Sequence, residues 1–272
     1  MMDRFKSLLY LPANRASAVA KARTLPADAV LLDLEDAVQP DAKPEARAAA
    51  IAAAAEGGWG ARKLFLRVNA IGTAWHADDM AAATGGGIDG LVVPKVDSAA
   101  QAQAVVAAAA GLPVLAMIET PAGVLAAPQI AAVPGIAGLI AGMADLAKDL
   151  RCGSDAVRTP LLYSLSAIVL AARASGIACF DGVFTDITSE AGFLAEAAQG
   201  RLLGFDGKTL IHPSQVAPCN LAFSPTPQQL VDAAGLIAAY EAGLAAGKGV
   251  TTYKGQLIEV LHVAQAREML AR

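Results

Sequence analysis

The chain has 272 residues, 55% of them hydrophobic, and a formal net charge of −4. The mildly acidic balance, with no dense run of Lys and Arg, argues against nucleic-acid binding. The longest weakly polar run, residues 124–144, has about the length of a membrane span, but Pro128, Gln129 and Pro134 interrupt it, so no transmembrane segment or membrane partner is expected.

Two further features of the sequence bear on compartment and redox state. The apolar stretch near the start, residues 7–12, is too short for a secretory signal, so the cytoplasm is the expected location. Cys152, Cys179 and Cys219 are scattered and lack metal-ligand spacing. They are expected to be small buried thiols and not part of a disulfide framework or a zinc site.

Eight short apolar segments alternate with alanine-rich helical segments along the chain. This alternation predicts a parallel sheet. Eight units favour a closed TIM (β/α)8 barrel, although the pattern alone leaves an open doubly wound sheet as an alternative. The expected strands are 8–12, 29–34, 64–69, 90–95, 113–120, 138–145, 179–185 and 204–212, and the clearest helices are 16–24, 44–56, 99–110, 161–175 and 190–199.

The chain continues beyond what eight units require. We expect residues 1–215 to form the barrel and residues 216–272 to form a C-terminal helical extension. The extension contains a long helix over 228–246 and a final helix reaching Arg272. It would pack either on its own barrel or on a neighbouring subunit.

Polar residues follow the predicted strands. In an α/β barrel the carboxyl ends of all strands meet at one rim, where catalytic groups gather. The sequence therefore predicts an active-site mouth at that rim, although any single residue there could instead be a structural cap. The polar strand ends include Asn14, Arg15, Asp33, Glu35, Asp36, Arg67, Asn69, Lys95, Glu119, Asp145, Asp181, Asp186, Lys208 and His212.

Glu119 and Asp145 close the fifth and sixth predicted strands. A charge at the end of a buried strand is costly unless something pairs with it. Mg²⁺ accepts one or two carboxylates together with water and substrate oxygens, so one reading is that both residues hold one divalent cation. The other reading is that each caps a helix or pairs with an arginine. No His or Cys set accompanies them, which disfavours Zn²⁺.

Arg67 lies just inside the end of the third predicted strand. Its guanidinium could grip a substrate carboxylate with two parallel hydrogen bonds. It could equally pair inside the protein with the acidic cluster Asp33–Glu35–Asp36, which would then orient Arg67 or metal-bound water.

Other groups near the same rim carry positive charge or titrate near neutral pH. Arg15, Lys21 and Lys95 could neutralise phosphates or a thioester-bearing cofactor, although a lone lysine such as Lys21 is usually a solvated surface group. His212 could serve as a general base, and a histidine held in a packed loop is at least as common.

Read together, the strand-end motifs resemble those of the citrate lyase β-subunit-like and malyl-CoA lyase family, within the HpcH/HpaI aldolase superfamily. The resemblance runs in order over nearly the whole chain. It is carried by residues 11–15 (LPANR), 32–38 (LDLEDAV), 66–69 (LRVN), 93–95 (VPK), 118–123 (IETPAG), 205–208 (FDGK) and 211–215 (IHPSQ), and extends to 253–255 (YKG).

This resemblance implies a TIM barrel, a Mg²⁺ ion with Mn²⁺ as an alternative, and a substrate that contains CoA. The implied reaction cleaves a β-hydroxyacyl-CoA of the citryl-CoA or malyl-CoA type into an acyl-CoA and a 2-oxo acid. By motif position, Glu119 and Asp145 would be the metal ligands, which places Glu119 against the substrate, and Arg67 would contact the 2-oxo acid. Tyr10, Arg15 and Lys21 would contact CoA, with His212 nearby.

The family usually assembles as trimers or hexamers, and its C-terminal segment lends an acidic residue to a neighbour's site. That acid is usually aspartate, whereas this chain has Glu259 at the matching position. Glutamate keeps the charge but adds a methylene, and a misplacement of about 1 Å can cost ~10²-fold in rate. The change from aspartate to glutamate leaves open which substrate is used, how efficient catalysis is, and whether a thioester hydrolysis step occurs.

Three other functions remain open at this stage. A malyl-CoA-type thioesterase would hydrolyse the thioester and leave the hydroxy acid intact. A class II aldolase would use similar barrel chemistry on free 2-oxo acids without CoA. A non-catalytic subunit of a citrate lyase complex would show no turnover alone.

Overall fold

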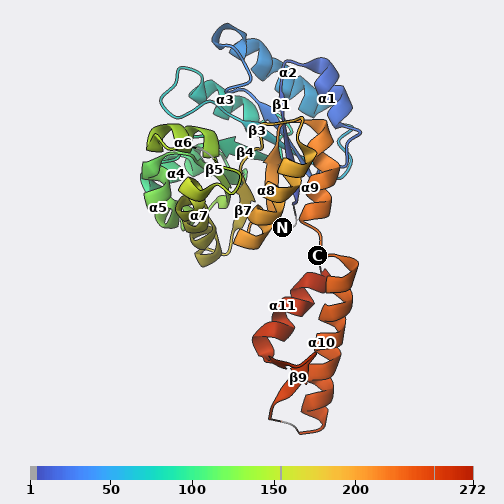
Figure 1. Cartoon of the computed structure of the whole chain (residues 1–272). Helices are drawn as coiled ribbons and strands as arrows, with labels where there is room; N and C mark the ends of the chain where they lie inside the picture. The colour runs from blue at the N-terminus through green and yellow to red at the C-terminus, as the bar shows by residue number, and fades with distance from the viewer. Residues whose placement is uncertain (1–4, 154, 248, 272) are drawn as a thin grey trace. The chain divides into compact units, whose positions relative to one another are not determined.

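A computed structural model describes residues 5–153, 155–247 and 249–271. Eight parallel strands pair in sequence order, and β8 pairs with β1 to close a barrel (Figure 1). The predicted TIM barrel is thereby confirmed, and the open sheet is excluded. The strands are β1 (Ser7–Pro12), β2 (Ala29–Asp33), β3 (Lys63–Arg67), β4 (Gly90–Val93), β5 (Val114–Ile118), β6 (Ile136–Ala141), β7 (Ala178–Asp181) and β8 (Gly207–Leu210).

Helices surround these strands, as each β-to-β crossover requires (Figure 1). The clearest helices expected from the sequence did not include α3, α5, α6 and α9, and the first residues of α6 were assigned to a strand. The helices of this region are α1 (Ala16–Ala22), α2 (Lys43–Glu56), α3 (His76–Ala83), α4 (Ala99–Ala108), α5 (Pro121–Ala131), α6 (Met143–Leu150), α7 (Leu162–Ala174), α8 (Glu190–Leu203) and α9 (Val216–Ala222), with 3-10 turns at η2 (Pro40–Ala42), η3 (Thr159–Leu161) and η4 (Pro213–Gln215).

The strands are apolar on both faces because both faces are covered. Inward-facing side chains such as Leu31, Phe65, Leu115 and Phe180 fill the barrel. The alternate residues of each strand pack outward against the helices in a second, larger apolar cluster. The barrel interior is therefore a packed core and not a pore.

The strands end earlier than the sequence predicted, which changes the setting of Asp145. Strand β6 ends at Ala141, and Asp145 lies in the first turn of α6 rather than at a strand end. The error arose because a short run of small apolar residues fits a strand and a buried helix equally well. An acidic side chain in the first turn also interacts favourably with the helix dipole.

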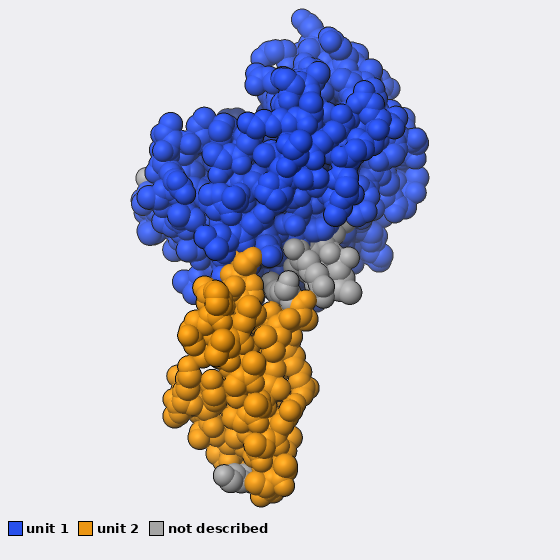
Figure 2. Space-filling model, turned by 90° about the vertical axis from the view of Figure 1, so that its right-hand side faces the viewer, with its two compact units in different colours: residues 1–223 blue, residues 224–272 orange. Residues whose placement is uncertain are grey.

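The chain divides into two compact units, residues 1–223 and residues 224–272, which Figure 2 shows in separate colours. Unit 1 includes α9, which the predicted boundary after residue 215 assigned to the extension. Unit 2 contains α10 (Pro227–Ala245), the antiparallel pair β9 (Thr251–Tyr253) and β10 (Gln256–Ile258), and α11 (Val260–Ala271). How the extension packs on a barrel stays a prediction.

Within unit 2, two glycines of α10 let the hairpin approach the helix. A Cβ atom at Gly235 would overlap the Tyr253 hydroxyl, and one at Gly243 would overlap Thr251. Among the helices of the described residues, none combines the length and apolarity needed to cross a membrane.

Candidate active site

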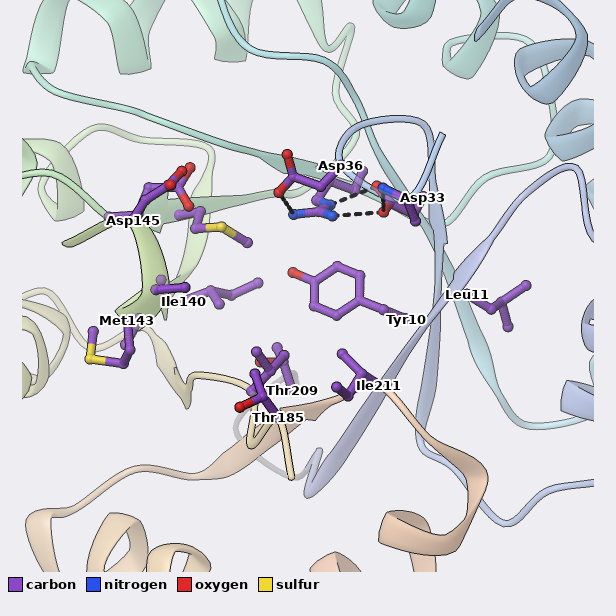
Figure 3. A pocket seen from close by; sticks show the side chains of 18 of the residues that line it. Tyr10, Leu11, Asp33, Asp36, Ile140, Met143, Asp145, Thr185, Thr209 and Ile211 are labelled. Atoms are coloured by element: carbon purple, nitrogen blue, oxygen red, sulfur yellow. Dashed lines mark hydrogen bonds and ion pairs between the residues drawn. The ribbon is translucent and has the colours of Figure 1, made fainter. Parts of the chain in front are cut away.

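A pocket of about 500 Å³ opens at the carboxyl ends of the strands in unit 1. Residues from six strand ends and from the loops after them line it, and Figure 3 shows their side chains converging on one space. The sequence-predicted residues Tyr10, Arg15, Arg67, Glu119 and Asp145 all border this pocket. The other lining residues include Asp33, Asp36, Met117, Ile140, Met143, Val183, Thr185, Thr209 and Ile211.

Arg67, the last residue of β3, is held by the end of the neighbouring strand β2. Its Nε lies 2.7 Å from Oδ1 of Asp33 and its Nη2 lies 2.6 Å from Oδ2, so the two side chains form a double hydrogen bond. The remaining nitrogen, Nη1, lies 2.8 Å from Glu35 and 3.5 Å from Asp36. Of the two sequence readings of Arg67, internal pairing is therefore present, and the guanidinium nevertheless borders the pocket.

Tyr10 lies beneath this guanidinium, with its ring centroid 4.8 Å from the Arg67 Cζ atom. Figure 3 shows the ring crossing the pocket with its hydroxyl directed toward Ile140. The hydroxyl oxygen is closed off from water and has no hydrogen-bond partner. Burial raises the pKa of this phenol above its usual range, so the group is a neutral donor.

Glu119 follows β5 and is almost completely buried. Its Oε1 accepts a hydrogen bond of 2.9 Å from the backbone N–H of Lys95. Burial, reinforced by the nearby Glu35 carboxylate, raises the pKa of Glu119 to about 8 even though Lys95 opposes the shift. Burial likewise raises the pKa of Glu35 to about 7 against the effect of Arg67. Neither carboxyl therefore has enough positive charge nearby to offset the cost of ionising it in its buried position.

Asp145 forms its ion pair with the side chain of Lys95, whose Nζ lies 2.8 Å from Oδ2. The same Nζ lies 3.9 Å from Oε1 of Glu35. Lys95 follows β4 and has a left-handed backbone, with φ of 53°. We refer to the acidic and basic groups at this rim as the mouth cluster: Asp33, Glu35, Asp36, Arg67, Lys95, Glu119 and Asp145.

The mouth cluster has more acids than bases, with Arg67 and Lys95 as its cations. Among the described residues, no three His, Cys, Asp or Glu side chains are arranged to hold a metal ion by themselves. Glu119 and Asp145 nevertheless fit Mg²⁺, which takes one or two carboxylates and completes its shell with water and substrate oxygens. Glu119 is buried with little nearby positive charge, so a divalent cation bound beside it would favour its ionised form.

Three predicted site residues lie outside the pocket lining. Lys21 is exposed near the end of α1. His212 is exposed, and its Nδ1 lies 2.7 Å from the hydroxyl of Ser214 at the start of η4. Glu259 is exposed in unit 2, where its backbone N–H donates to His262. Their roles remain predictions.

The pocket lining lacks eight of the polar strand-end residues that the sequence placed on the rim: Asn14, Glu35, Asn69, Lys95, Asp181, Asp186, Lys208 and His212. Asp181 and Lys208 are fully buried and point away from the pocket, toward Arg158 and the α8 residue Glu196. Thr209, next to Lys208, faces the pocket instead. Successive residues of a strand point to opposite faces, so a polar strand end faces the mouth only in one register.

Sequence reasoning missed Gly142, at the start of α6. A side chain at this position would overlap the Cβ of Glu119 and would lie 2.7 Å from its Oε2. The glycine therefore lets Glu119 and α6 approach each other. The signal was present in the sequence as a glycine inside the expected strand 138–145, a position that often marks close backbone approach.

Fold and site together define an α/β-barrel protein with an acidic pocket at the carboxyl ends of its strands. The chain belongs to the HpcH/HpaI aldolase/citrate lyase family, whose model matches residues 6–213. The resemblance read from the strand-end motifs is thereby confirmed.

Individual relatives share nearly the whole chain. A (3S)-malyl-CoA thioesterase of Cereibacter sphaeroides is 41% identical over 98% of this chain and 94% of its own. The structure of CitE from Mycobacterium tuberculosis in complex with magnesium, acetoacetate and coenzyme A matches with a TM-score of 0.84 and 31% identity, covering 100% of this chain and 98% of that one.

A citrate lyase beta subunit from M. tuberculosis, complexed with oxaloacetate and magnesium, matches with a TM-score of 0.73 and 35% identity. The match covers 83% of this chain and 100% of that chain. Structural neighbours of this chain have thus been found with magnesium together with CoA or a 2-oxo acid.

Proposed function

We propose that this chain is a Mg²⁺-dependent CoA-ester lyase that cleaves a β-hydroxyacyl-CoA into an acyl-CoA and a 2-oxo acid. The observation that carries the proposal is the excess of buried carboxylates beside a fixed guanidinium at the mouth of the barrel. Such a site calls for a bound cation and can hold a substrate carboxylate at the same time.

In this proposal Glu119 and Asp145 would hold the metal ion. When bound, Mg²⁺ supplies Lewis-acid stabilisation for the hydroxyl oxygen that becomes the keto group and for the adjacent carboxylate. Metal-bound relatives with a 2-oxo acid support this assignment. Mn²⁺ has the same preference for oxygen ligands and would substitute for Mg²⁺.

Arg67 would bind the carboxylate that ends up on the 2-oxo acid. Asp33 takes the Nε donor and one Nη2 donor, and Nη1 faces Glu35 and Asp36, so the second Nη2 donor remains for a ligand. The double hydrogen bond to Asp33 fixes the plane of the guanidinium before substrate arrives, which lowers the entropic cost of binding.

The reaction balances as a reversed Claisen condensation. A base takes the proton of the substrate hydroxyl, the C–C bond breaks, and the electron pair moves onto the thioester as an enolate. A proton then adds to the carbon of the enolate, from Glu259 of a neighbouring copy of the chain or from water. Arg15, Lys21 and His212 would contact CoA, and the assembly would be a homotrimer or hexamer.

Thioester hydrolysis is a second candidate function. It is supported by the 41% identity to a (3S)-malyl-CoA thioesterase that covers 98% of this chain. A thioesterase would release CoA with a free thiol and leave the hydroxy acid intact. A lyase leaves CoA acylated and releases a 2-oxo acid.

One assay separates these reactions. Purified full-length protein is incubated with malyl-CoA and then with citryl-CoA, with Mg²⁺ and with EDTA, while phenylhydrazine reports 2-oxo acid and a thiol reagent reports free CoA. We expect Mg²⁺-dependent 2-oxo acid without a matching rise in thiol. Thiol without 2-oxo acid would favour the thioesterase. No product from either ester would exclude both.

Two variants test the residue assignments in the same assay. Glu119→Gln should abolish most turnover, because it removes the charge that holds the metal. Glu56→Gln is the matched control, since Glu56 is an exposed partner of Arg23 away from the pocket lining. Equal activity of the two variants would reject the role of Glu119.

A further inference from the structure

Lys95 contacts the carboxylates of the mouth cluster through both its backbone and its side chain. Its backbone N–H donates to Glu119, and its ammonium pairs with Asp145 at 2.8 Å and lies 3.9 Å from Glu35. Its left-handed backbone, with φ of 53°, is unfavourable for a lysine. Such a conformation is retained only where the surroundings enforce it.

The position of this ammonium has a consequence for cation binding. Asp145 is one of the two carboxylates proposed to hold Mg²⁺, and its Oδ2 is already paired with Lys95. Glu119, the other one, also experiences the charge of Lys95. A divalent cation arriving between these carboxylates would be repelled by the ammonium and would compete with it for Asp145.

We propose that Lys95 is a positioning residue whose ammonium takes the place of the divalent cation in the metal-free protein. The ammonium offsets the repulsion between Asp145 and Glu35, the backbone N–H of Lys95 holds Glu119 beside them, and the ammonium releases Asp145 when the metal binds. The proposal rests on the proposed metal site. It assigns to Lys95 two opposite effects, stabilising the free protein and weakening the affinity for Mg²⁺.

Substitutions at Lys95 separate these effects. Lys95→Met keeps the length of the side chain and the backbone N–H to Glu119 but removes the charge. Lys95→Gln repeats the test with a polar side chain, in case the methionine variant does not fold. Lys95→Arg restores the charge. The left-handed backbone is equally unfavourable for all three replacements, since none of them is glycine.

The matched control is Lys63→Met. Lys63 begins β3, at the opposite rim of the barrel, and its Nζ lies 2.7 Å from Asp89. This control therefore removes the same charge and one lysine–aspartate ion pair without touching the mouth cluster.

The experiment titrates MgCl₂ into metal-stripped, full-length protein by isothermal calorimetry and records thermal melts in EDTA. We expect Lys95→Met and Lys95→Gln to bind Mg²⁺ roughly three- to tenfold more tightly than wild type, because a nearby like charge is gone. In EDTA both variants should melt at a lower temperature than wild type, and added Mg²⁺ should raise their melting temperatures by more than it raises that of wild type. Lys95→Arg and Lys63→Met should bind Mg²⁺ as wild type does.

Unchanged or weaker Mg²⁺ binding by both uncharged variants would overturn the role of Lys95 while leaving the proposed function in place. Absence of Mg²⁺ binding by wild type and every variant would overturn the metal site itself. The two failures are therefore distinct, and neither depends on an activity assay.

Discussion

Two clusters of acidic and basic side chains among the described residues of the barrel differ in charge balance. The mouth cluster opens to the pocket and contains more carboxylates than cations. The second, which we call the wall cluster, consists of Arg158, Asp181, Glu196 and Lys208 and lies between strands β7 and β8 and helix α8. It pairs equal numbers of acids and bases.

Within the wall cluster, every charged side chain pairs with one of opposite charge. Lys208 is fully buried, and its Nζ lies 3.0 Å from Asp181, 2.7 Å from Glu196 and within hydrogen-bond distance of the Gly182 carbonyl. Arg158 contributes a 2.7 Å pair to Asp181. Burial alone would raise the pKa of Asp181, but Lys208 and Arg158 outweigh it and hold the pKa below its usual range.

The two carboxyl groups Asp181 and Glu119 are both buried, yet their pKa values shift in opposite directions. The difference arises from counter-charge and not from depth. A balanced cluster stabilises the fold with no ligand, whereas an undercompensated one leaves free energy available for binding a cation. Charge balance therefore distinguishes a structural cluster from a candidate site within one barrel.

The largest effect is expected from a substitution that disrupts the wall cluster. Lys208→Met leaves Asp181 and Glu196 buried with less counter-charge, which should lower the free energy of unfolding by about 3–5 kcal/mol. Urea denaturation measures this change. Lys63→Met, which removes an exposed pair, should cost less than about 1 kcal/mol. Equal losses for the two variants would show that the wall cluster contributes no special stability.

Arg67→Lys tests the mouth cluster. A lysine keeps the charge but cannot reproduce the double hydrogen bond to Asp33, so kcat/KM should fall by roughly 10²-fold. The steady-state rate of 2-oxo acid release measures this loss. Arg173→Lys is the control, since Arg173 pairs with the buried Asp206 away from the pocket lining. Native activity of Arg67→Lys would contradict a geometric role for the guanidinium.

The pH dependence of stability should also differ between the clusters. In EDTA, Glu119 and Glu35 bind protons more tightly in the folded than in the unfolded protein, because their pKa values are raised to about 8 and about 7. Their contribution is complete below the unfolded pKa and is lost as pH rises through those values, a decrease on the order of 4 kcal/mol between pH 6 and pH 8. Urea denaturation at a series of pH values measures it.

The variant Glu119→Gln should flatten this pH dependence, because it no longer titrates. Saturating Mg²⁺ should reverse the loss at high pH, since the ion replaces the protons as counter-charge. Stability that rises between about pH 6 and pH 8 in EDTA would contradict the assignment of an undercompensated mouth cluster.

The smallest expected effect concerns Tyr10. Its hydroxyl is buried without a partner, so Tyr10→Phe should leave stability unchanged or raise it by about 1 kcal/mol. Urea denaturation with Tyr163→Phe, at an exposed tyrosine, provides the comparison. A clear loss of stability on removing the Tyr10 hydroxyl would reveal a hydrogen bond that the structure does not contain.

The amino-acid sequence predicted the barrel because strands buried on both faces are apolar throughout. Eight such segments alternate with helical segments along the chain. It also brought Arg67, Glu119 and Asp145 to one rim correctly, since the carboxyl ends of parallel strands must meet there. It misplaced Asp145 on a strand, because small apolar residues fit strand and helix alike.

The sequence by itself thus determined the architecture and which residues gather at the mouth. Only the tertiary structure decided which charges compensate one another. Asp181 and Lys208 looked like site residues and became a buried pair, because strand register turned them outward. Lys95 looked like one basic residue among several, and its backbone conformation brought it against Glu35, Glu119 and Asp145. Charge balance depends on distances across the fold, which no local pattern encodes.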